Sequence, residues 1–600
     1  MENKINEVIP AEYIVLIVEY SNKDLFNKIN DLPGASAVVI DESFGFVVIP
    51  VDEVGLLDPY IKEIIRIEVP QIYTLQNISP AEASGAPSFN SNPYLSLTGT
   101  GVLVGILDTG IDYLSKEFQL EDDTTRILRI WDQTLVGNKS IYGIKLGVEY
   151  NEDQINEAIK LKSAGGDPYS IVKSKDEIGH GTMSAGLIGA RGENPDVIGV
   201  APKCEFAVVK MLEVGKGKLA SAGIIDKGTG RYSTEVISMS LRYLSTLATE
   251  LKKPIVIYMP MGTNIGAHDG TSELEGYIDV VSKQLGVAVV SGTGNEGDTD
   301  THIEGRFVKA GEIKTIEIKV GEKQKNLFFN IYIRQPDRVS LSVISPSGQV
   351  VEKIPAKLNN REDIKFVYEG TKMEIIYRLP DERTGDEIIT IKAVNLRAGI
   401  WQFKLHGDFI VDGRYWSWLP QRSLLDPDTK FLSPSQYTTL TMPSTAQSSI
   451  VAAYYNQNNN STVGQSGRGF TRDERIKPDI VAGGINATII KPGGGTGVVS
   501  GSSVSTSILA GCCALIYQWG IIDGNDKSLY TRKLRSYIIR GGQLRSGDLY
   551  PNEQWGYGRL SMQGIFDAIR GNTVGGVGQT RRIEDYNEYK VGSLFIRKPI

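Results

Sequence analysis

The stretch GVLVGILDTGID, residues 101–112, decides the fold class of this 600-residue chain. It begins as a continuous apolar run bounded by glycine, which is typical of a strand buried on both faces of a parallel sheet. Similar runs follow at 206–212, 254–260 and 286–292, and helical patterns such as TSELEGYIDVVSKQLG (271–286) lie between them. Apolar strands that alternate with helices predict an α/β domain with a doubly wound parallel sheet.

Two other patterns flank or interrupt this region. Residues 1–76 have the order strand, helix, two strands, helix, strand, which predicts a ferredoxin-like α+β unit. Residues 305–420 consist of short strands separated by turns, a pattern typical of an all-β jelly roll or sandwich. The predicted organisation is therefore an N-terminal unit, an α/β domain in two parts (77–304 and 421–575) with the β domain inserted between them, and a C-terminal tail (576–600).

Composition argues against several classes of function. The formal net charge of −7 disfavours nucleic acid as the main partner, because a phosphate backbone requires a basic surface. No apolar run reaches the roughly 18 residues of a membrane-spanning helix, so we expect no membrane span. The three cysteines include an adjacent pair and suit neither a disulfide framework nor a metal site. The N-terminus lacks the layout of a signal peptide, so we expect cytoplasmic synthesis without one.

Three separate stretches contain residues suited to nucleophilic catalysis. Asp108 follows the first apolar strand, His180 lies between two glycines in DEIGHGTMSAGLIGA, and Ser503 lies in SGSSVSTSILAG. A serine hydroxyl becomes a good nucleophile when a histidine takes its proton and a carboxylate holds that histidine. Taken singly, Asp108 also fits a turn residue or helix cap, and His180 fits an ordinary loop residue. Together they have the order Asp, His, Ser, which differs from that of chymotrypsin-like and α/β-hydrolase enzymes.

With these motifs the chain resembles the subtilisin-like serine proteases, or subtilases. The family writes the three motifs D-[TS]-G, H-G-T and G-T-S-x-A-x-P, and here they begin at Asp108, His180 and Gly501. The resemblance covers both parts of the predicted α/β domain, and it implies that Ser503 is the nucleophile of a serine endopeptidase. One alternative is an aspartic protease, since LDTG alone fits that family, but no second Asp-Thr/Ser-Gly motif occurs.

The chain departs from the family pattern around the nucleophile. Ser502 stands where the family usually has Thr, Ser505 where it has Ala, and Ser507 where it has Pro. These differences lie on the helix that follows the nucleophile and leave the geometry of that loop open.

The resemblance also implies residues that bind the substrate. Asn295 in VAVVSGTGNEG would donate a hydrogen bond to the tetrahedral intermediate beside the backbone N–H of Ser503; the alternative is an ordinary turn residue. The segment YMPMGTN matches the family's substrate-binding strand. Met261, Gly262 and Gly294 would therefore contact an extended peptide substrate.

The N-terminal unit resembles the propeptide of the family, which assists folding and plugs the active site. Its last segment, IEVPQIYTLQ (67–76), is extended, and the residues after it are small and polar. We therefore predict a single self-cleavage within residues 72–80, with Gln76–Asn77 as the preferred bond, after which the propeptide stays bound non-covalently to a monomer.

The chemistry implied by the resemblance requires no cofactor. Some subtilases bind Ca²⁺ through an acidic residue nine positions after the catalytic Asp and a loop after the H-G-T helix, and here these positions correspond to Glu117, Glu193 and Asp196. Hard cations prefer such oxygen ligands. The alternative is that these are ordinary surface acids.

One subgroup, the Csp-type germination proteases of spore-forming bacteria, matches more closely. It combines a propeptide, a jelly-roll insert between the oxyanion Asn and the Ser, and a short C-terminal tail. The subgroup implies packaging in the spore and activation of a spore-cortex hydrolase zymogen. Because some members are pseudoproteases, the alternative function is a silent binding or signalling scaffold. The preferred residue before the cut and the role of the insert stay open.

Overall fold

The computed structural model describes residues 12–75, 83–90, 95–137, 140–215, 224–225, 228 and 230–571. Its central sheet consists of β6 (Leu103–Asp108), β7 (Ile127–Asp132), β8 (Val148–Asn151), β9 (Glu205–Lys210), β11 (Ile255–Met259), β13 (Val287–Gly292), β25 (Ile450–Asn456), β26 (Ser461–Thr462) and β27 (Ile480–Gly483). The strand order is β26-β25-β13-β11-β6-β9-β7-β8, and β27 also pairs with β25.

The sheet is parallel except at two edges, where β8 and β26 run antiparallel to their neighbours. The four apolar runs predicted as strands are β6, β9, β11 and β13, which confirms the α/β assignment. Their side chains alternate between the two faces of the sheet: Val104 and Ile106 belong to one hydrophobic cluster, Leu103 and Leu107 to another. Both faces are covered, and this accounts for the continuous apolar sequence of these strands.

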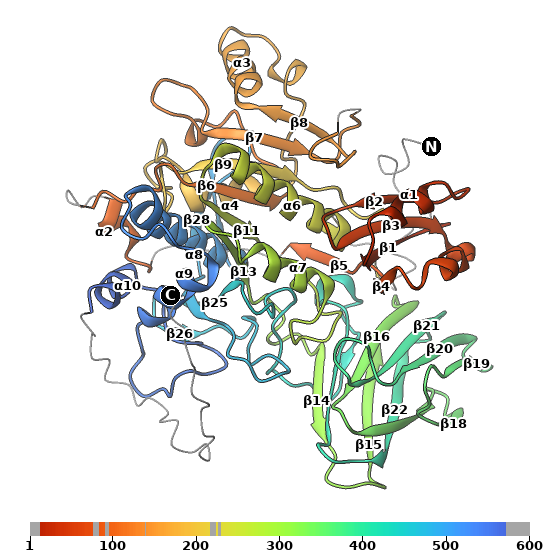
Figure 1. Ribbon diagram of the computed structural model, residues 1–600. Coiled ribbons are helices and arrows are strands. Elements are labelled where there is room, and N and C mark those ends of the chain that lie inside the picture. The colour runs from red at the N-terminus through yellow and green to blue at the C-terminus, as the bar shows by residue number, and fades with distance from the viewer. Residues whose placement is uncertain are drawn as a thin grey trace, which may run out of the picture.

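Helices cover both faces (Figure 1). The residues of α4 (His180–Gly189) and α8 (Ser502–Tyr517) belong to the first cluster, and those of α6 (Thr234–Leu251) and α7 (Glu273–Val281) belong to the second. The remaining helical segments are α2 (Ala86–Asn90), η2 (Lys116–Phe118), α3 (Glu152–Ser163), η3 (Pro168–Ser170), η4 (Arg422–Leu424), η5 (Gln518–Ile522), α9 (Thr531–Arg540) and α10 (Met562–Ile569). The hairpin of β28 (Ala487–Ile490) and β29 (Thr496–Val499) leads into α8.

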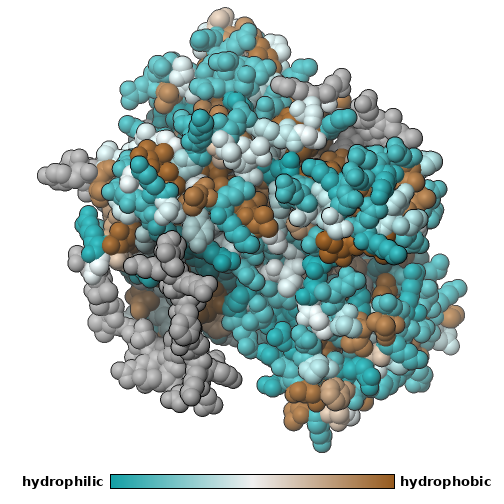
Figure 2. Space-filling model, viewed as in Figure 1, coloured by the Kyte–Doolittle hydropathy of each residue, from teal (hydrophilic) through white to brown (hydrophobic). Residues whose placement is uncertain are grey.

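The apolar character of α8 comes from its central position. Ser502–Ile522, which joins α8 and η5, is long and apolar enough to cross a membrane, but 83% of its most apolar 18-residue window lies buried inside the protein. It packs against β11, β13 and β25. A helix surrounded by its own domain is hydrophobic on all sides, so its composition fits a core helix. Elsewhere the visible surface is mostly hydrophilic, with scattered hydrophobic residues (Figure 2).

The N-terminal unit lies beside α6 and α7 (Figure 1). Its elements are β1 (Tyr13–Tyr20), α1 (Asp24–Asn30), β2 (Ser36–Val39), β3 (Phe44–Pro50), the 3-10 helix η1 (Val51–Tyr60) and β4 (Ile64–Glu68), and the strand order is β2-β3-β1-β4. The segment predicted as its second helix is thus a 3-10 helix, which contains Pro59. Val15, Ile17, Phe46 and Val48 belong to the same cluster as α6 and α7, so the unit shares a core with the α/β domain.

The insert consists of two antiparallel sheets around one core. Its strands are β14 (His302–Arg306), β15 (Ile313–Val320), β16 (Asn326–Ile333), β17 (Arg338–Ile344), β18 (Val350–Ile354), β19 (Arg361–Phe366), β20 (Thr371–Arg378), β21 (Glu387–Val394), β22 (Gly399–Phe409), β23 (Arg414–Trp418) and β24 (Lys430–Phe431). One sheet has the order β14-β23-β16-β21-β20-β19 and the other β18-β17-β22-β15-β24. Both sheets therefore draw a strand from just outside 305–420, at His302 and at Phe431.

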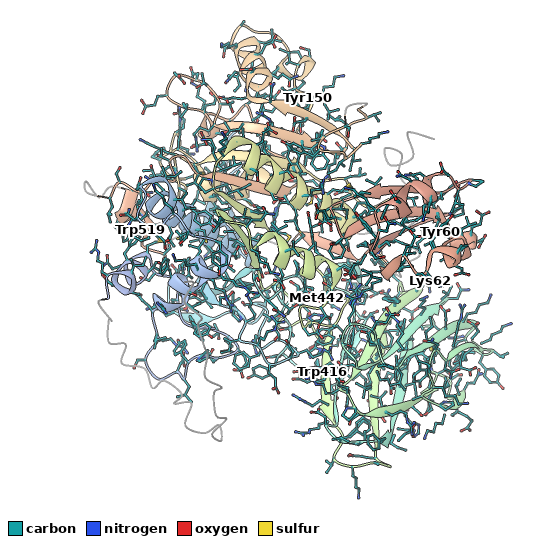
Figure 3. The ribbon with its side chains drawn as sticks, viewed as in Figure 1. Tyr60, Lys62, Tyr150, Trp416, Met442 and Trp519 are labelled. Atoms are coloured by element: carbon teal, nitrogen blue, oxygen red, sulfur yellow. The ribbon has the colours of Figure 1, made fainter. Side chains whose placement is uncertain are left out.

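A buried arginine joins the insert to the α/β domain. Arg472 forms ion pairs with Asp269 of the α/β domain and Asp386 of the insert, and its guanidinium lies over the ring of Trp416, 5.5 Å from the centroid. Trp416 and Met442 mark the place where the insert adjoins the α/β domain (Figure 3). A cation shared between two buried carboxylates is strongly destabilised by the loss of either one, so the arrangement favours a fixed orientation of the insert.

Candidate active site

The structure brings Asp108, His180 and Ser503 together. Nδ1 of His180 lies 2.8 Å from Oδ1 and 2.7 Å from Oδ2 of Asp108, and Nε2 of the same ring lies 3.2 Å from Oγ of Ser503. All three side chains are buried. Because each ring nitrogen faces one partner, the carboxylate holds the proton on Nδ1 and leaves Nε2 to accept the serine proton.

Each of these residues lies at the end of an element. Asp108 is the last residue of β6, His180 the first of α4 and Ser503 the second of α8. The carboxyl ends of parallel strands and the helices that follow meet at one edge of the sheet, where open α/β sheets bind their ligands. Close approach requires Gly181, since a Cβ there would lie 2.0 Å from the carbonyl oxygen of Gly110.

The carboxylate of Asp176 holds the backbone next to both Asp108 and His180. It accepts hydrogen bonds from the hydroxyl of Thr109 (2.7 Å) and the N–H of Gly179 (2.7 Å). It also accepts the N–H (2.8 Å) and the hydroxyl (2.6 Å) of Thr182. The N–H of Thr109 donates in turn to Oδ1 of Asp108 at 2.7 Å. Burial raises the pKa of Asp108, and the neighbouring imidazole opposes that rise.

The family departures around the nucleophile fit the loop geometry. The hydroxyl of Ser502 accepts the N–H of Gly294 at 3.2 Å, as a threonine hydroxyl at this position could. The hydroxyl of Ser505 donates to the carbonyl of Ser502 at 2.8 Å, and that of Ser507 donates to the carbonyl of Ser503 at 2.9 Å. The extra hydroxyls are therefore hydrogen-bonded within α8 and leave the triad intact.

Asn295 lies beside the nucleophile, as the resemblance implies. Its side-chain oxygen accepts the N–H of Ser502 at 3.0 Å. This contact engages the amide oxygen, and the amide nitrogen is the group of Asn295 that can donate to a developing oxyanion.

The predicted substrate strand holds a segment of the chain itself. Backbone residues Ile72–Leu75 form β5, which lies between β10 (Arg231–Ser233) and β12 (Met261–Gly262) in an antiparallel three-stranded sheet. Leu75 pairs with Met261, and Thr74 pairs with Gly262 on one side and Arg231 on the other. An extended peptide that adds a strand between two edges is the binding mode of β-augmentation. Gln76 and Asn77, the predicted cleavage position, lie outside the described residues, as does the tail 576–600.

The candidate calcium ligands do not gather around a common point. Buried Glu117 accepts the backbone N–H groups of Gly192 (3.0 Å), Glu193 (3.1 Å) and Asn194 (2.7 Å), so its carboxylate anchors the loop after α4. The side chain of Glu193 pairs instead with Arg191 at 2.5 Å. Within the described ranges no three His, Cys, Asp or Glu side chains are grouped to hold a metal ion. Calcium binding at Glu117, Glu193 and Asp196 stays a prediction.

The anchoring role of Glu117 predicts a loss of stability in Glu117→Gln. The amide keeps the size of the side chain but removes the charge and turns one acceptor into a donor that faces N–H groups. Hydrogen bonds to a charged group contribute about 1.5–3 kcal/mol, so we expect the free energy of unfolding to fall by about 2 kcal/mol. Urea unfolding measures this change.

Glu193→Gln is the matched control for this substitution, since its side chain is 50% exposed, and it should unfold with the wild type. Equal stability of Glu117→Gln and wild type would contradict the anchoring role. Thermal melts of the wild type with CaCl₂ and with EDTA test the calcium prediction, because a bound ion raises the melting temperature.

Two parts of the site were missed from the sequence. Residues Arg231–Ser233 form the second wall of the cleft, and a three-residue strand gives no periodic signal. Asp176 lies four residues before His180 in the same motif, and a carboxylate so close to the histidine could have indicated a supporting residue.

The comparisons with known proteins agree with this geometry. Residues 99–323 and 429–558 match the subtilase family. The structure of the Clostridium perfringens CspB protease is similar, with a TM-score of 0.72 and 32% identity over 81% of this chain and 96% of that one.

Two proteins of Bacillus subtilis (strain 168) are also similar to parts of this chain. The minor extracellular protease Epr is 28% identical over 201 residues, 32% of this chain and 26% of that protein. The major intracellular serine protease is 33% identical over 129 residues, 22% of this chain and 33% of that protein. The chain thus spans about a quarter to a third of the length of these two relatives. With its matched regions divided by the insert and its triad assembled at the edge of the sheet, the chain belongs to the subtilase family.

Proposed function

We propose that this protein is a serine endopeptidase that cleaves peptide bonds by acyl transfer. The observation that carries the proposal is the continuous hydrogen-bonded path from Asp108 through His180 to Ser503. Ser503 Oγ attacks the scissile carbonyl while Nε2 of His180 takes its proton, and the imidazolium then protonates the leaving amine. Water then attacks the acyl-enzyme in the same way, with His180 first taking its proton and then returning a proton to Ser503. Asn295 and the N–H of Ser503 stabilise the oxyanion in both steps.

A fluorophosphonate probe distinguishes this function from a catalytically silent scaffold. The probe reacts with a serine hydroxyl only where a neighbouring base activates it. We expect labelling on Ser503, located by peptide mass spectrometry, and no labelling after His180→Ala. A folded, propeptide-free protein that resists the probe would favour the binding or signalling alternative.

We further propose that the N-terminal unit is a propeptide and that the enzyme removes it by its own activity. The backbone pairing of β5 with Met261 and Gly262 supports this, because it is the pairing expected of a bound substrate. β5 ends at Leu75, one residue before the cleavage position predicted between Gln76 and Asn77. The freed unit should stay bound, since Val15 and Phe46 belong to the cluster that contains α6 and α7.

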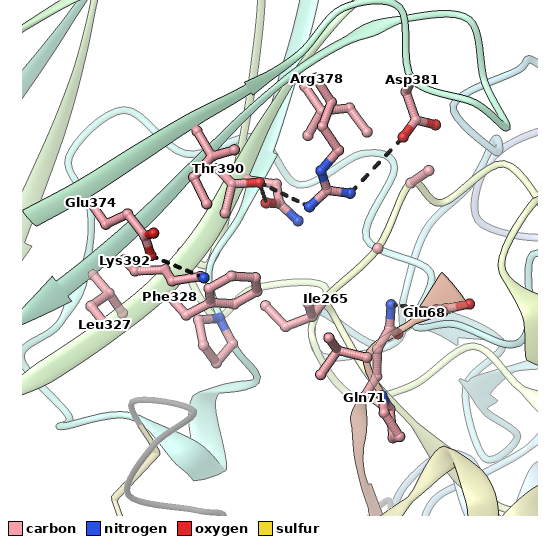
Figure 4. Close-up of a pocket in the computed structure, with 18 of the residues that line it drawn as sticks. Glu68, Gln71, Ile265, Leu327, Phe328, Glu374, Arg378, Asp381, Thr390 and Lys392 are labelled. Carbon is pink, nitrogen blue, oxygen red and sulfur yellow. Dashed lines mark hydrogen bonds and ion pairs between the residues drawn. The ribbon is translucent and has the colours of Figure 1, made fainter. Parts of the chain in front are cut away.

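The insert has contacts that suit a role in holding this propeptide. Nη1 of Arg383, in the loop between β20 and β21, lies 2.7 Å from Oε2 of Glu68, and its other nitrogen pairs with Glu273 of α7. The N–H of Glu273 also donates to Glu68 at 3.0 Å. One guanidinium thus joins the insert, the propeptide and the catalytic domain, beside a cavity of about 1230 Å³ that all three line (Figure 4).

Arg383→Ala is predicted to loosen the propeptide. Without the guanidinium, Glu68 and Glu273 are two adjacent carboxylates, of which Glu273 keeps a longer ion pair with Arg66 at 3.5 Å, and burial already raises the pKa of Glu273 to about 7. Truncating one partner of a buried charge pair costs about 2–5 kcal/mol, mostly in the dissociation rate. We expect dissociation to become at least about 30-fold faster, measured by exchange of the bound unit against a labelled copy.

Arg378→Ala is the matched control, because Arg378 also lines the cavity but forms its ion pair within the insert, with Asp381 at 4.0 Å. It should release the propeptide at the wild-type rate. Equal release from both variants would show that the Arg383 contacts do not hold the propeptide.

Asn295→Ala should lower kcat and leave KM nearly unchanged, because an oxyanion donor acts mainly in the transition state. Removal of one such donor costs about 10²–10³ in rate, a value known for subtilisin. Peptide cleavage by propeptide-free enzyme measures both constants. A rise in KM with unchanged kcat would assign Asn295 to ground-state binding instead.

The likeness to CspB also supports a proposal for the biological role. We propose that the enzyme is packaged in the spore and activates the zymogen of a spore-cortex hydrolase during germination. Incubation of the processed enzyme with such a zymogen, followed by N-terminal sequencing of the product, tests this. The same cut by Ser503→Ala would refute it.

A further inference from the structure

We infer that Tyr258 is a positioning residue that sets the distance between the catalytic base and the nucleophile. The inference rests on the proposed serine protease activity. Tyr258 lies in β11 and is completely buried. Its hydroxyl oxygen is 3.0 Å from the carbonyl oxygen of Ser503 and 3.0 Å from Oγ of Ser184. One phenol group therefore contacts both helices of the site.

The donors and acceptors of this contact can be assigned. The phenol is the donor in both contacts, so its single proton is shared between the carbonyl oxygen of Ser503 and Oγ of Ser184. Burial raises the pKa of Tyr258 well above the ordinary value, so the phenol keeps this proton around neutral pH.

The two residues bridged by Tyr258 belong to the reacting helices. Ser184 lies one turn after His180 in α4, and Ser503 is the nucleophile at the start of α8. Fixing Ser184 and the Ser503 carbonyl relative to one phenol fixes the relative position of the helices. The reacting distance between them, from Nε2 of His180 to Oγ of Ser503, is 3.2 Å.

The strand that carries Tyr258 gives the bridge a rigid base. β11 is paired on one side with β6, which ends at Asp108, and on the other with β13, which leads to Asn295. All three strands are buried along their whole length. The phenol therefore projects from the same rigid frame that places the acid and the oxyanion residue.

Ser507 reinforces the same carbonyl. Its hydroxyl donates to the carbonyl of Ser503 at 2.9 Å, next to the phenol at 3.0 Å. The subtilase motif usually has proline here, which offers no donor. This chain therefore holds the nucleophile's carbonyl with two side-chain hydroxyls.

The test compares Tyr258→Phe with Tyr377→Phe in the full-length chain. Both substitutions remove one buried hydroxyl that donates to a backbone carbonyl at 3.0 Å, and Tyr377 lies in the insert. A misplacement of about 1 Å at a reacting centre costs on the order of 10²-fold. We expect self-processing after refolding to slow by about 10- to 100-fold in Tyr258→Phe and to stay at the wild-type rate in Tyr377→Phe. Folding rates are measured in parallel on a Ser503→Ala background.

The pH profile separates positioning from a general loss of structure. Because the hydroxyl of Tyr258 bonds Ser184 and the carbonyl of Ser503, Tyr258→Phe should lower the plateau of the processing rate and leave its midpoint in pH unchanged. Ser184→Ala should act in the same direction and add little to Tyr258→Phe, since both remove one bridge. Wild-type processing by Tyr258→Phe, or slowing that follows slower folding, would overturn the inference.

Failure of the proposed function would look different. If the wild-type chain never cleaves itself, the proposal of self-processing is refuted. The role of Tyr258 can still be tested, by the rate at which the fluorophosphonate probe reacts with propeptide-free protein. There the maximal labelling rate should fall in Tyr258→Phe while the concentration for half-maximal rate stays the same. Equal labelling rates of Tyr258→Phe and Tyr377→Phe would again overturn the inference.

Discussion

Ser503→Ala is expected to yield a single intact chain, where the wild type yields two fragments that stay together. The substitution removes the hydroxyl that lies 3.2 Å from Nε2 of His180. In subtilisin, loss of the nucleophile costs roughly 10⁶ in kcat. The junction after β5 is attached to the enzyme, so its effective concentration is high and even a weak match to the pockets should be cut.

Mass spectrometry and gels measure this outcome directly. The wild type should give masses for 1–76 and 77–600, two bands in a denaturing gel and one peak in gel filtration. Ser505→Ala is the matched control, because its hydroxyl donates to the carbonyl of Ser502 in the same helix. It should process like the wild type. Two bands from Ser503→Ala, purified away from other proteases, would mean that another enzyme makes the cut.

Asp108→Asn is expected to cost about 10⁴ in turnover while the protein stays folded. Both carboxylate oxygens lie within 2.8 Å of Nδ1 of His180 and hold its proton there. An amide at this place can donate to Nδ1 instead, which moves the ring proton to Nε2 and leaves no base toward Ser503. The fold should survive because the amide has the same size as the carboxylate.

The rate constant for self-processing and the melting temperature are measured on the same preparation. Asp112→Asn is the matched control, since its carboxylate accepts backbone N–H groups of Leu114 and Gly493 and does not contact the triad. A wild-type rate in Asp108→Asn would show that the carboxylate does not set the tautomer. A collapse of the melting temperature would show a structural role in its place.

The sequence by itself determined the α/β domain and the three residues that the structure brings together at its edge. Strands buried on both faces must be apolar throughout, so β6, β9, β11 and β13 were recognisable as uninterrupted apolar runs. Asp108, His180 and Ser503 each lie in a short motif, because a group at the tip of a strand or helix needs particular neighbours such as Gly181 to fit. Local requirements of this kind are visible in local sequence.

Only the tertiary structure decided which residues join elements that lie far apart in the sequence. In the sequence Tyr258 is indistinguishable from the apolar residues of its strand. Its hydroxyl can bridge two helices because Ser184 and Ser503, 74 and 245 positions away, both lie within hydrogen-bonding distance of it. The same holds for Arg383, whose partner Glu68 is 315 positions away. The three backbone N–H groups that bind the carboxylate of Glu117 are likewise visible only in the structure. Such contacts join separate elements, so their residues carry no periodic or motif signal, and packing alone selects them.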